Sequence, residues 1–157
     1  MLAQTATELE QIIAAAEPRL RILPGEIIAH RPAADRWTIQ EVLGHLIDSA
    51  ANNHQRFVRA QFTAELVFPK YEQNQWVAAA QYQAAPWPVL VDLWSSYNQL
   101  LAHLIRHANP AALPRICIIG PYEPVTLEFL IADYVVHLRH HLEKIGERAG
   151  VALLPQK

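Results

Sequence analysis

The chain has 157 residues, of which 52% are hydrophobic, so it is long enough to bury the core of one domain. Its formal net charge is −2, and its acidic and basic residues are interspersed. This pattern excludes the basic face of a nucleic-acid-binding protein and the acidic block of a disordered tail, so we expect one domain over residues 1–157 that binds small molecules.

The first long helix is expected at residues 5–23, where apolar residues recur at helical spacing until Pro24-Gly25 stops the pattern. Residues 25–37 are expected to form a connector with turns. A second helix should occupy residues 38–62, because Thr38-Ile-Gln-Glu41 matches a capping box in which the two side chains satisfy backbone N–H groups at a helix start.

The sequence pattern in the middle of the chain predicts a loop, a short helix and a third long helix. The loop is expected at residues 63–70, the short helix at 71–83, and the long helix at 88–108, with Pro88 in its first turn.

A long irregular connection should follow at residues 110–125, which hold four prolines and the short run Ile116–Ile119, a run that could be extended. The last helix is then expected at 126–149, with Thr126 as its N-cap and Gly150 at its end.

These elements predict an all-α fold: an up-and-down four-helix bundle with a short extra helix and a long irregular connection before the last helix. Periodicity assigns one apolar face to each long helix. The residues expected in the core are Leu9, Ile13, Leu43, Leu46, Phe57, Leu93, Leu100, Leu104, Ile131, Leu138 and Leu142.

Cys117 is the only cysteine, so the chain cannot form an internal disulfide. The amino terminus has no basic segment followed by an apolar run, and no apolar stretch approaches the roughly 18 residues that suggest a membrane span. The simplest location is therefore a reducing cytoplasm, with no membrane as partner. The sequence leaves open whether the chain forms a homodimer.

Three of the eight histidines are predicted to bind one metal ion. His137 and His141 are four residues apart, so on a helix their rings stand one turn apart on the same face, at the edge of the apolar stripe. His45 occupies a similar position on the second helix. Three imidazoles with an open fourth position suit catalytic zinc, and imidazole also suits nickel, iron and copper.

The other histidines are expected to serve no metal. His103 and His107 have the same spacing, but they lie in the last turn of their helix, where the helix dipole favours a solvated imidazolium. His30, His54 and His140 are expected on the surface.

Three segments of the chain match patterns typical of one protein family. They are Trp37-Thr-Ile-Gln-Glu-Val-Leu-Gly-His45-Leu-Ile-Asp48, Phe68-Pro-Lys-Tyr71-Glu-Gln-Asn-Gln-Trp76 and Tyr134-Val-Val-His137-Leu-Arg-His140-His141-Leu-Glu-Lys-Ile145. In these segments the chain resembles the DinB-like superfamily of metal-binding four-helix bundles. The middle segment is similar to the YfiT-like branch, whose members are described as metal-dependent hydrolases and include a bacillithiol transferase. Val136 departs from that branch, which often has tryptophan there.

The resemblance implies metal ligands at His45, His137 and His141, with zinc or nickel as the metal. It also implies a reaction in which a low-molecular-weight thiol attacks an electrophilic small molecule. Ser49, Asn53 and Arg56 would then be candidate catalytic residues lining the site.

Arg56 is a candidate to bind a carboxylate of the thiol cofactor. Asp133, one turn before His137, could orient a ligand imidazole or could be a solvated carboxylate.

Three alternatives stay open from the sequence. The metal could activate water in a hydrolase, or it could simply staple a non-catalytic bundle. The polar stripe that carries Ser49, Asn53 and Arg56 could also be an ordinary boundary between core and solvent.

Overall fold

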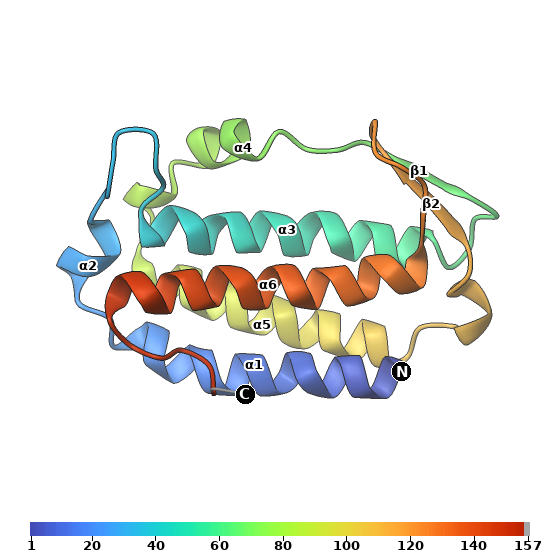
Figure 1. Cartoon of the computed structure of the whole chain (residues 1–157), viewed down its shortest axis with the longest axis horizontal. Helices are drawn as coiled ribbons and strands as arrows, with labels where there is room; N and C mark the ends of the chain where they lie inside the picture. The colour runs from blue at the N-terminus through green and yellow to red at the C-terminus, as the bar shows by residue number, and fades with distance from the viewer. Residues whose placement is uncertain (156–157) are drawn as a thin grey trace.

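The computed structural model of the chain describes residues 1–155, which form a bundle of four long helices (Figure 1). The long helices are α1 (Leu2–Arg21), α3 (Ile39–Arg59), α5 (Trp87–Arg106) and α6 (Leu127–Ala149). The shorter helices are α2 (Gly25–Ala29), α4 (Gln73–Ala80) and the 3-10 turns η1 (Tyr82–Ala84) and η2 (Pro110–Ala112). Three strands, β1 (Leu66–Phe68), β2 (Ile116–Ile119) and β3 (Val125–Thr126), form one small sheet.

The predicted four-helix bundle is confirmed, with one refinement of its up-and-down order. Helices α3 and α5 lie side by side and run in the same direction, and α1 and α6 run the opposite way (Figure 1). Side chains tie the matching ends of α3 and α5: Gln40 donates to the Tyr82 carbonyl at one end, and the Asn109 N–H donates to Gln61 at the other.

The ends of α3 and α6 follow the predicted sequence signals. The Thr38 hydroxyl accepts from the Glu41 N–H, and the Glu41 carboxylate accepts from the Thr38 N–H, so the capping box is complete. Thr126 caps α6 by accepting from the Phe129 N–H, and Gly150, with φ of 69°, ends it. None of the helices among the described residues is both long and apolar enough to cross a membrane.

The small sheet corrects the prediction of a plain loop at residues 63–70. Strand β1 forms there and pairs in parallel with β2, aligning Leu66 with Cys117, while β2 pairs with β3 in antiparallel. The run Ile116–Ile119 is extended, as the sequence suggested. Strand β1 is three residues long and depends on a partner about 50 residues away, so no local pattern marks it. The helix α2 was likewise not expected, because residues 25–37 were assigned to a connector.

The core is mostly as predicted, but the facing of α5 was wrong. Leu93 and Leu100 are 47% and 44% exposed, and Leu104 is only half-buried. The buried face of α5 instead carries Leu90, Val91, Trp94, Leu101, Ala102 and Ile105. Helix α5 has apolar residues on two faces, and periodicity alone does not say which face meets α1 and α3. The other eight predicted core residues are buried.

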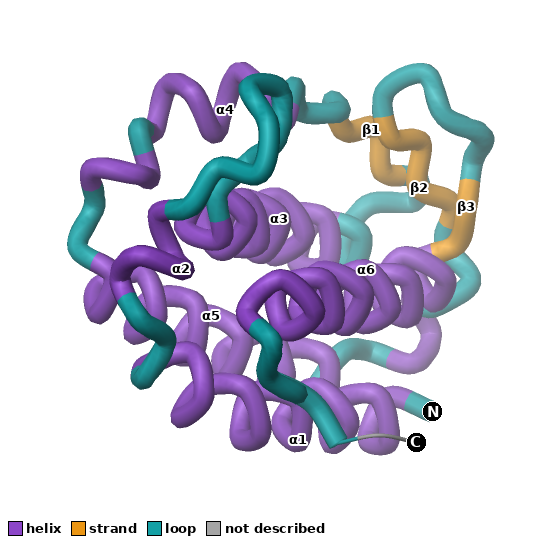
Figure 2. Tube along the Cα trace, turned by 60° about the vertical axis from the view of Figure 1, so that its left-hand side comes forward, coloured by secondary structure: helices purple, strands orange, loops and turns teal. Residues whose placement is uncertain are grey.

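Helix α4 and the sheet lie on the α3 and α6 side of the bundle, away from α1 (Figure 2). The segment around η1 is held on α3 by Tyr82, whose hydroxyl donates to Asp48 at 2.5 Å and whose ring lies directly on Gly44. A Cβ at position 44 would overlap that ring, so glycine is required for the close approach.

Gly44→Ala is expected to lower the free energy of unfolding by about 1–3 kcal/mol, because the Tyr82 ring must move off α3. Gly25→Ala is the matched control, since a Cβ there meets nothing within 4 Å, and its expected effect is neutral or slightly stabilising. Urea unfolding of both variants measures the difference. Equal stability of Gly44→Ala and the wild type would show that the Tyr82 contact can be lost without cost.

Candidate metal centre

The three predicted histidines converge between α3 and α6. These helices pack antiparallel, which places His45 of α3 opposite His137 and His141 of α6. The Nε2 atoms of His45 and His137 lie 3.4 Å apart, and the rings of His137 and His141 have centroids 4.5 Å apart. One ligand atom from each histidine lies within 4.8 Å of the others, which is close enough for one metal ion.

The geometry of the three imidazoles fits a divalent metal. Two nitrogens bonded to zinc at about 2.0–2.1 Å with a tetrahedral angle would be roughly 3.3 Å apart, near the observed 3.4 Å. The His45 ring is 1% exposed, its Nδ1 has no hydrogen-bond partner, and its Nε2 faces another imidazole. A buried imidazole with so few partners is costly in free energy unless a ligand supplies a bond.

The electrostatics of the site keep the imidazoles neutral at neutral pH. Burial, reinforced by the neighbouring histidines, lowers the pKa of His45 to about 3 and that of His141 to about 4. Burial also lowers the pKa of His137. Neutral imidazoles offer lone pairs, so protons compete little with a metal at pH 7.

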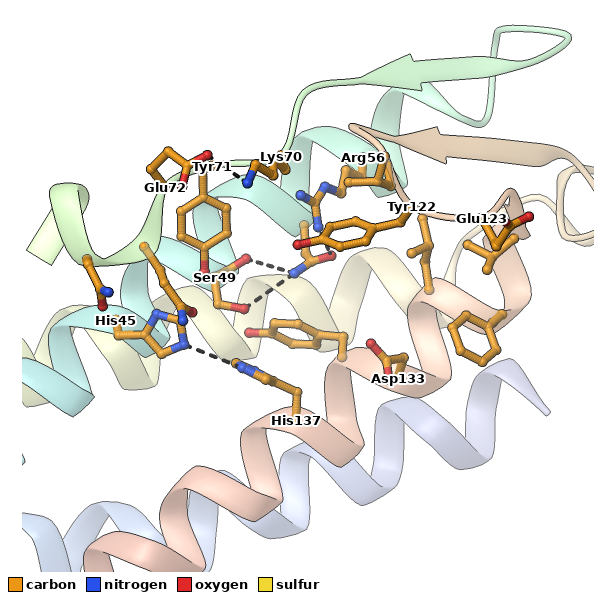
Figure 3. A pocket seen from close by; sticks show the side chains of 18 of the residues that line it. His45, Ser49, Arg56, Lys70, Tyr71, Glu72, Tyr122, Glu123, Asp133 and His137 are labelled. Carbon is orange, nitrogen blue, oxygen red and sulfur yellow. Dashed lines mark hydrogen bonds and ion pairs between the residues drawn. The ribbon is translucent and has the colours of Figure 1, made fainter. Parts of the chain in front are cut away.

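A cavity of about 790 Å³ opens beside the triad (Figure 3). His45 and His137 line it, and His141 does not, so a metal held by the triad would face the cavity from the side of the first two. The floor is made by α3 and α6, and the walls come from residues 70–75 and from the β2–β3 connection. A cavity of this size accommodates a small-molecule ligand.

The predicted polar stripe of α3 lines this cavity. Ser49, Asn53 and Arg56 are all buried and follow His45 along one face of the helix. The Asn53 amide donates to the Ser49 carbonyl at 3.0 Å and lies 3.4 Å from the Ser49 hydroxyl oxygen. The structure thus brings the predicted residues to the cavity, while their catalytic or binding roles stay predictions.

Arg56 is a buried cation with few partners. It is 9% exposed, its Nη1 lies 3.4 Å from the Asn53 side-chain oxygen, and its Nε has no partner. Its guanidinium lies 5.5 Å from the centre of the Phe68 ring, and no described carboxylate forms an ion pair with it. Burial lowers the pKa of Arg56, but guanidinium groups stay charged in proteins. An anionic ligand would therefore find an unpaired positive charge in the cavity.

Asp133 lines the cavity but forms no hydrogen bond with a histidine among the described contacts. It is exposed, and its charge raises the pKa of His137 against the larger effect of burial. The structure therefore provides an electrostatic influence on His137, without the direct orienting contact that the sequence allowed.

The remaining histidines mostly lie where they were expected. His30 and His140 are exposed, and so are His103 and His107 at the end of α5. His54 is a correction, because it is half-buried against α5, with its Nδ1 3.1 Å from the Tyr97 hydroxyl oxygen.

The residues that sequence reasoning missed are those that wall the cavity from loops. Lys70, Tyr71, Tyr122 and Glu123 all line it, and none lies on a long helix. Helical periodicity could not find them, because their positions depend on the pairing of β1 with β2. The one available signal was the segment around Tyr71, which the family resemblance includes without assigning it a role.

Without metal, the free energy of unfolding is expected to fall as the pH falls from about 6.5 to 4. The unfolded chain binds protons at these histidines near pH 6.5, whereas the folded chain resists protonation because the pKa values of the triad are lowered. Each imidazole contributes a slope of at most about 1.4 kcal/mol per pH unit.

Urea unfolding at several pH values in a metal chelator measures this slope. His45→Gln should make it shallower, and His140→Gln, at an exposed position, should not. An unchanged slope in His45→Gln would contradict the burial of a neutral imidazole at that position.

Comparisons with known proteins agree with this fold. The family model of the DinB superfamily matches residues 8–145. Two proteins, each named "Putative metal-dependent hydrolase", are similar in sequence. The one from Halalkalibacterium halodurans is 26% identical over 111 residues, covering 71% of this chain and 64% of that protein. The one from Oceanobacillus iheyensis is 25% identical over 109 residues, covering 69% and 63%. The matched region thus spans just under two thirds of each relative.

The structure of YfiT from Bacillus subtilis, described as a probable metal-dependent hydrolase with an unusual four-helix bundle topology, superposes with a TM-score of 0.81. The superposition covers 96% of this chain and 89% of YfiT at 21% identity, so it supports the fold. With most of its length matched by the family model, this chain belongs to the DinB superfamily.

Proposed function

We propose that the chain is a metal-dependent enzyme that joins a low-molecular-weight thiol to an electrophilic small molecule. The observation that carries this proposal is the meeting of two features in one cavity. The triad of His45, His137 and His141 presents two of its neutral imidazoles to one end of the cavity, and the unpaired cation of Arg56 lies farther along the helix that carries His45. A metal ion that only held the helices together would need neither the cavity nor the buried guanidinium.

A divalent metal in this position would acidify a bound thiol or water and so provide a nucleophile near pH 7. In the thiol reaction, sulfur forms a bond to an electrophilic carbon, and the leaving group departs with its electron pair. The thiol proton passes to solvent. The chain contributes three neutral ligands, a cavity that holds both reactants, and polar groups along α3 that orient them.

Arg56 is suited to bind an anionic group on the thiol. It lies three helical turns beyond His45 on α3, roughly 16 Å along the axis, although its long side chain shortens the distance to be spanned. A thiol whose sulfur lies at the triad would thus need an extended body to place a carboxylate at Arg56. Ser49 and Asn53 lie between the two ends and can hydrogen-bond to the middle of such a ligand.

Hydrolysis by activated water is the second candidate function, and the names of the two similar proteins favour it. The same three imidazoles and the same cavity serve either reaction, because the open position can hold a thiol or a water. The two candidates differ in whether the product contains the thiol sulfur.

The test uses zinc-loaded or nickel-loaded protein with 1-chloro-2,4-dinitrobenzene and ω-mercaptocarboxylic acids of increasing chain length. We expect thioether formation to be fastest with an intermediate chain length and to require the metal. Arg56→Met should raise the KM for the mercaptocarboxylic acids about tenfold or more, since a hydrogen bond to a charged group is lost. The neutral ω-mercaptoalkanols of the same lengths should not be affected.

Arg59→Met is the matched control, because Arg59 lies on α3 but is exposed and outside the cavity. Thioether formation that is equally fast without metal would contradict thiol transfer at the triad. Metal-dependent release of 2,4-dinitrophenol with no incorporation of thiol would instead support the hydrolase.

A further inference from the structure

The wall of the cavity above the triad carries a tyrosine that the metal ligands and the α3 stripe do not explain. Tyr71 enters from the segment between β1 and α4, and its ring stacks near that of His45, with centroids 6.3 Å apart and planes at 26° (Figure 3). The Trp76 ring packs against it in a T-shaped arrangement, with centroids 5.2 Å apart. Tyr71 lines the cavity together with His45 and His137.

The segment that carries Tyr71 is fixed at both ends. On one side, Phe68 pairs with β2, and its carbonyl accepts from the Gly120 N–H at 2.9 Å. Gly120 has φ of 55°, and a Cβ there would lie 3.0 Å from the Lys70 Cβ, so strand and turn pack closely. On the other side, Tyr82 holds η1, just after α4, against α3. The Tyr71 ring is therefore positioned by the fold.

The hydroxyl of Tyr71 points from this wall toward Ser49, down into the cavity and beside the His45 ring (Figure 3). A tyrosine hydroxyl has an ordinary pKa of about 10, so it keeps its proton at neutral pH. A protonated phenol can donate one hydrogen bond and accept another.

Two other polar groups of the cavity wall, those of Lys70 and Tyr122, are less suited to donate near the triad. The Lys70 ammonium is exposed and forms an ion pair with Glu72 at 2.8 Å. Tyr122 is 62% exposed, belongs to the β2–β3 connection and lies next to Arg56 in Figure 3, farther from His45 than Tyr71 does. Tyr71 is thus the wall residue that sets a hydroxyl donor beside a predicted metal ligand.

We propose that Tyr71 donates a hydrogen bond to an oxygen atom of the ligand that occupies the open side of the triad. The inference rests on the proposed metal centre and adds a substrate-contacting residue from outside the bundle. It implies that the ligand presents an oxygen acceptor next to the metal, such as a carboxylate, carbonyl or ether oxygen. A donor at that position stabilises negative charge that develops on the oxygen during reaction.

The test uses acetate as the probe and cobalt-loaded protein, whose visible absorption reports ligands that bind the metal. Tyr71→Phe keeps the ring against His45 and removes only the hydroxyl, so we expect the cobalt content to be unchanged and the Kd for acetate to rise at least about tenfold. Tyr122→Phe, which removes a hydroxyl from the same cavity, should bind acetate like the wild type. Ethanethiol, which carries no oxygen, should bind Tyr71→Phe and the wild type alike.

Equal acetate affinity of Tyr71→Phe and the wild type would overturn the proposal, as would wild-type cobalt protein that binds no acetate. Loss of cobalt from Tyr71→Phe would also overturn it, because Tyr71 would then act as a ligand. Wild-type protein that binds no cobalt at all would instead contradict the proposed metal centre. Failure of the Tyr71 proposal can therefore be distinguished from failure of the proposed metal centre.

Discussion

The packing of α3 against α6 is the constraint on which the site depends. It buries an imidazole from one helix against two from the other, and burial together with their mutual repulsion opposes protonation. Apolar packing supplies the free energy for this arrangement, since residues on both helices, such as Leu46 and Leu138, are almost completely buried. The bundle thus holds the lone pairs of three imidazoles close together, whereas in the unfolded chain water would solvate each imidazole separately.

The same packing leaves room for chemistry only where non-helical segments complete the walls. Helices α3 and α6 make the floor of the cavity, and the sheet and the segment before α4 close it from above. The helices and the non-helical segments therefore have different roles. The helices position the three histidines and Arg56, while the loops, held by strand pairing and by Tyr82 on Gly44, supply the other groups that line the cavity.

Much of the bundle and the composition of the triad could be predicted from the sequence, because both follow from the spacing of residues along a helix. His137 and His141 share a face by their separation, and His45 lies at the edge of an apolar stripe. The exposure of Leu93 could not be predicted, because α5 is apolar on more than one face and the choice is made by its neighbours. The position of Tyr71 could not be predicted either, since it is set by strands whose partners lie far apart in the chain.

We expect His45, His137 and His141 to bind one divalent metal with an open position toward the cavity. X-ray absorption of zinc-loaded protein, with the metal content of His45→Ala and His140→Ala measured alongside, tests it most directly. The expected result is one zinc per chain with three imidazole nitrogens at about 2.0–2.2 Å, loss of the metal in His45→Ala and its retention in His140→Ala. Full zinc content in His45→Ala, or zinc bound instead by His103 and His107, would contradict it.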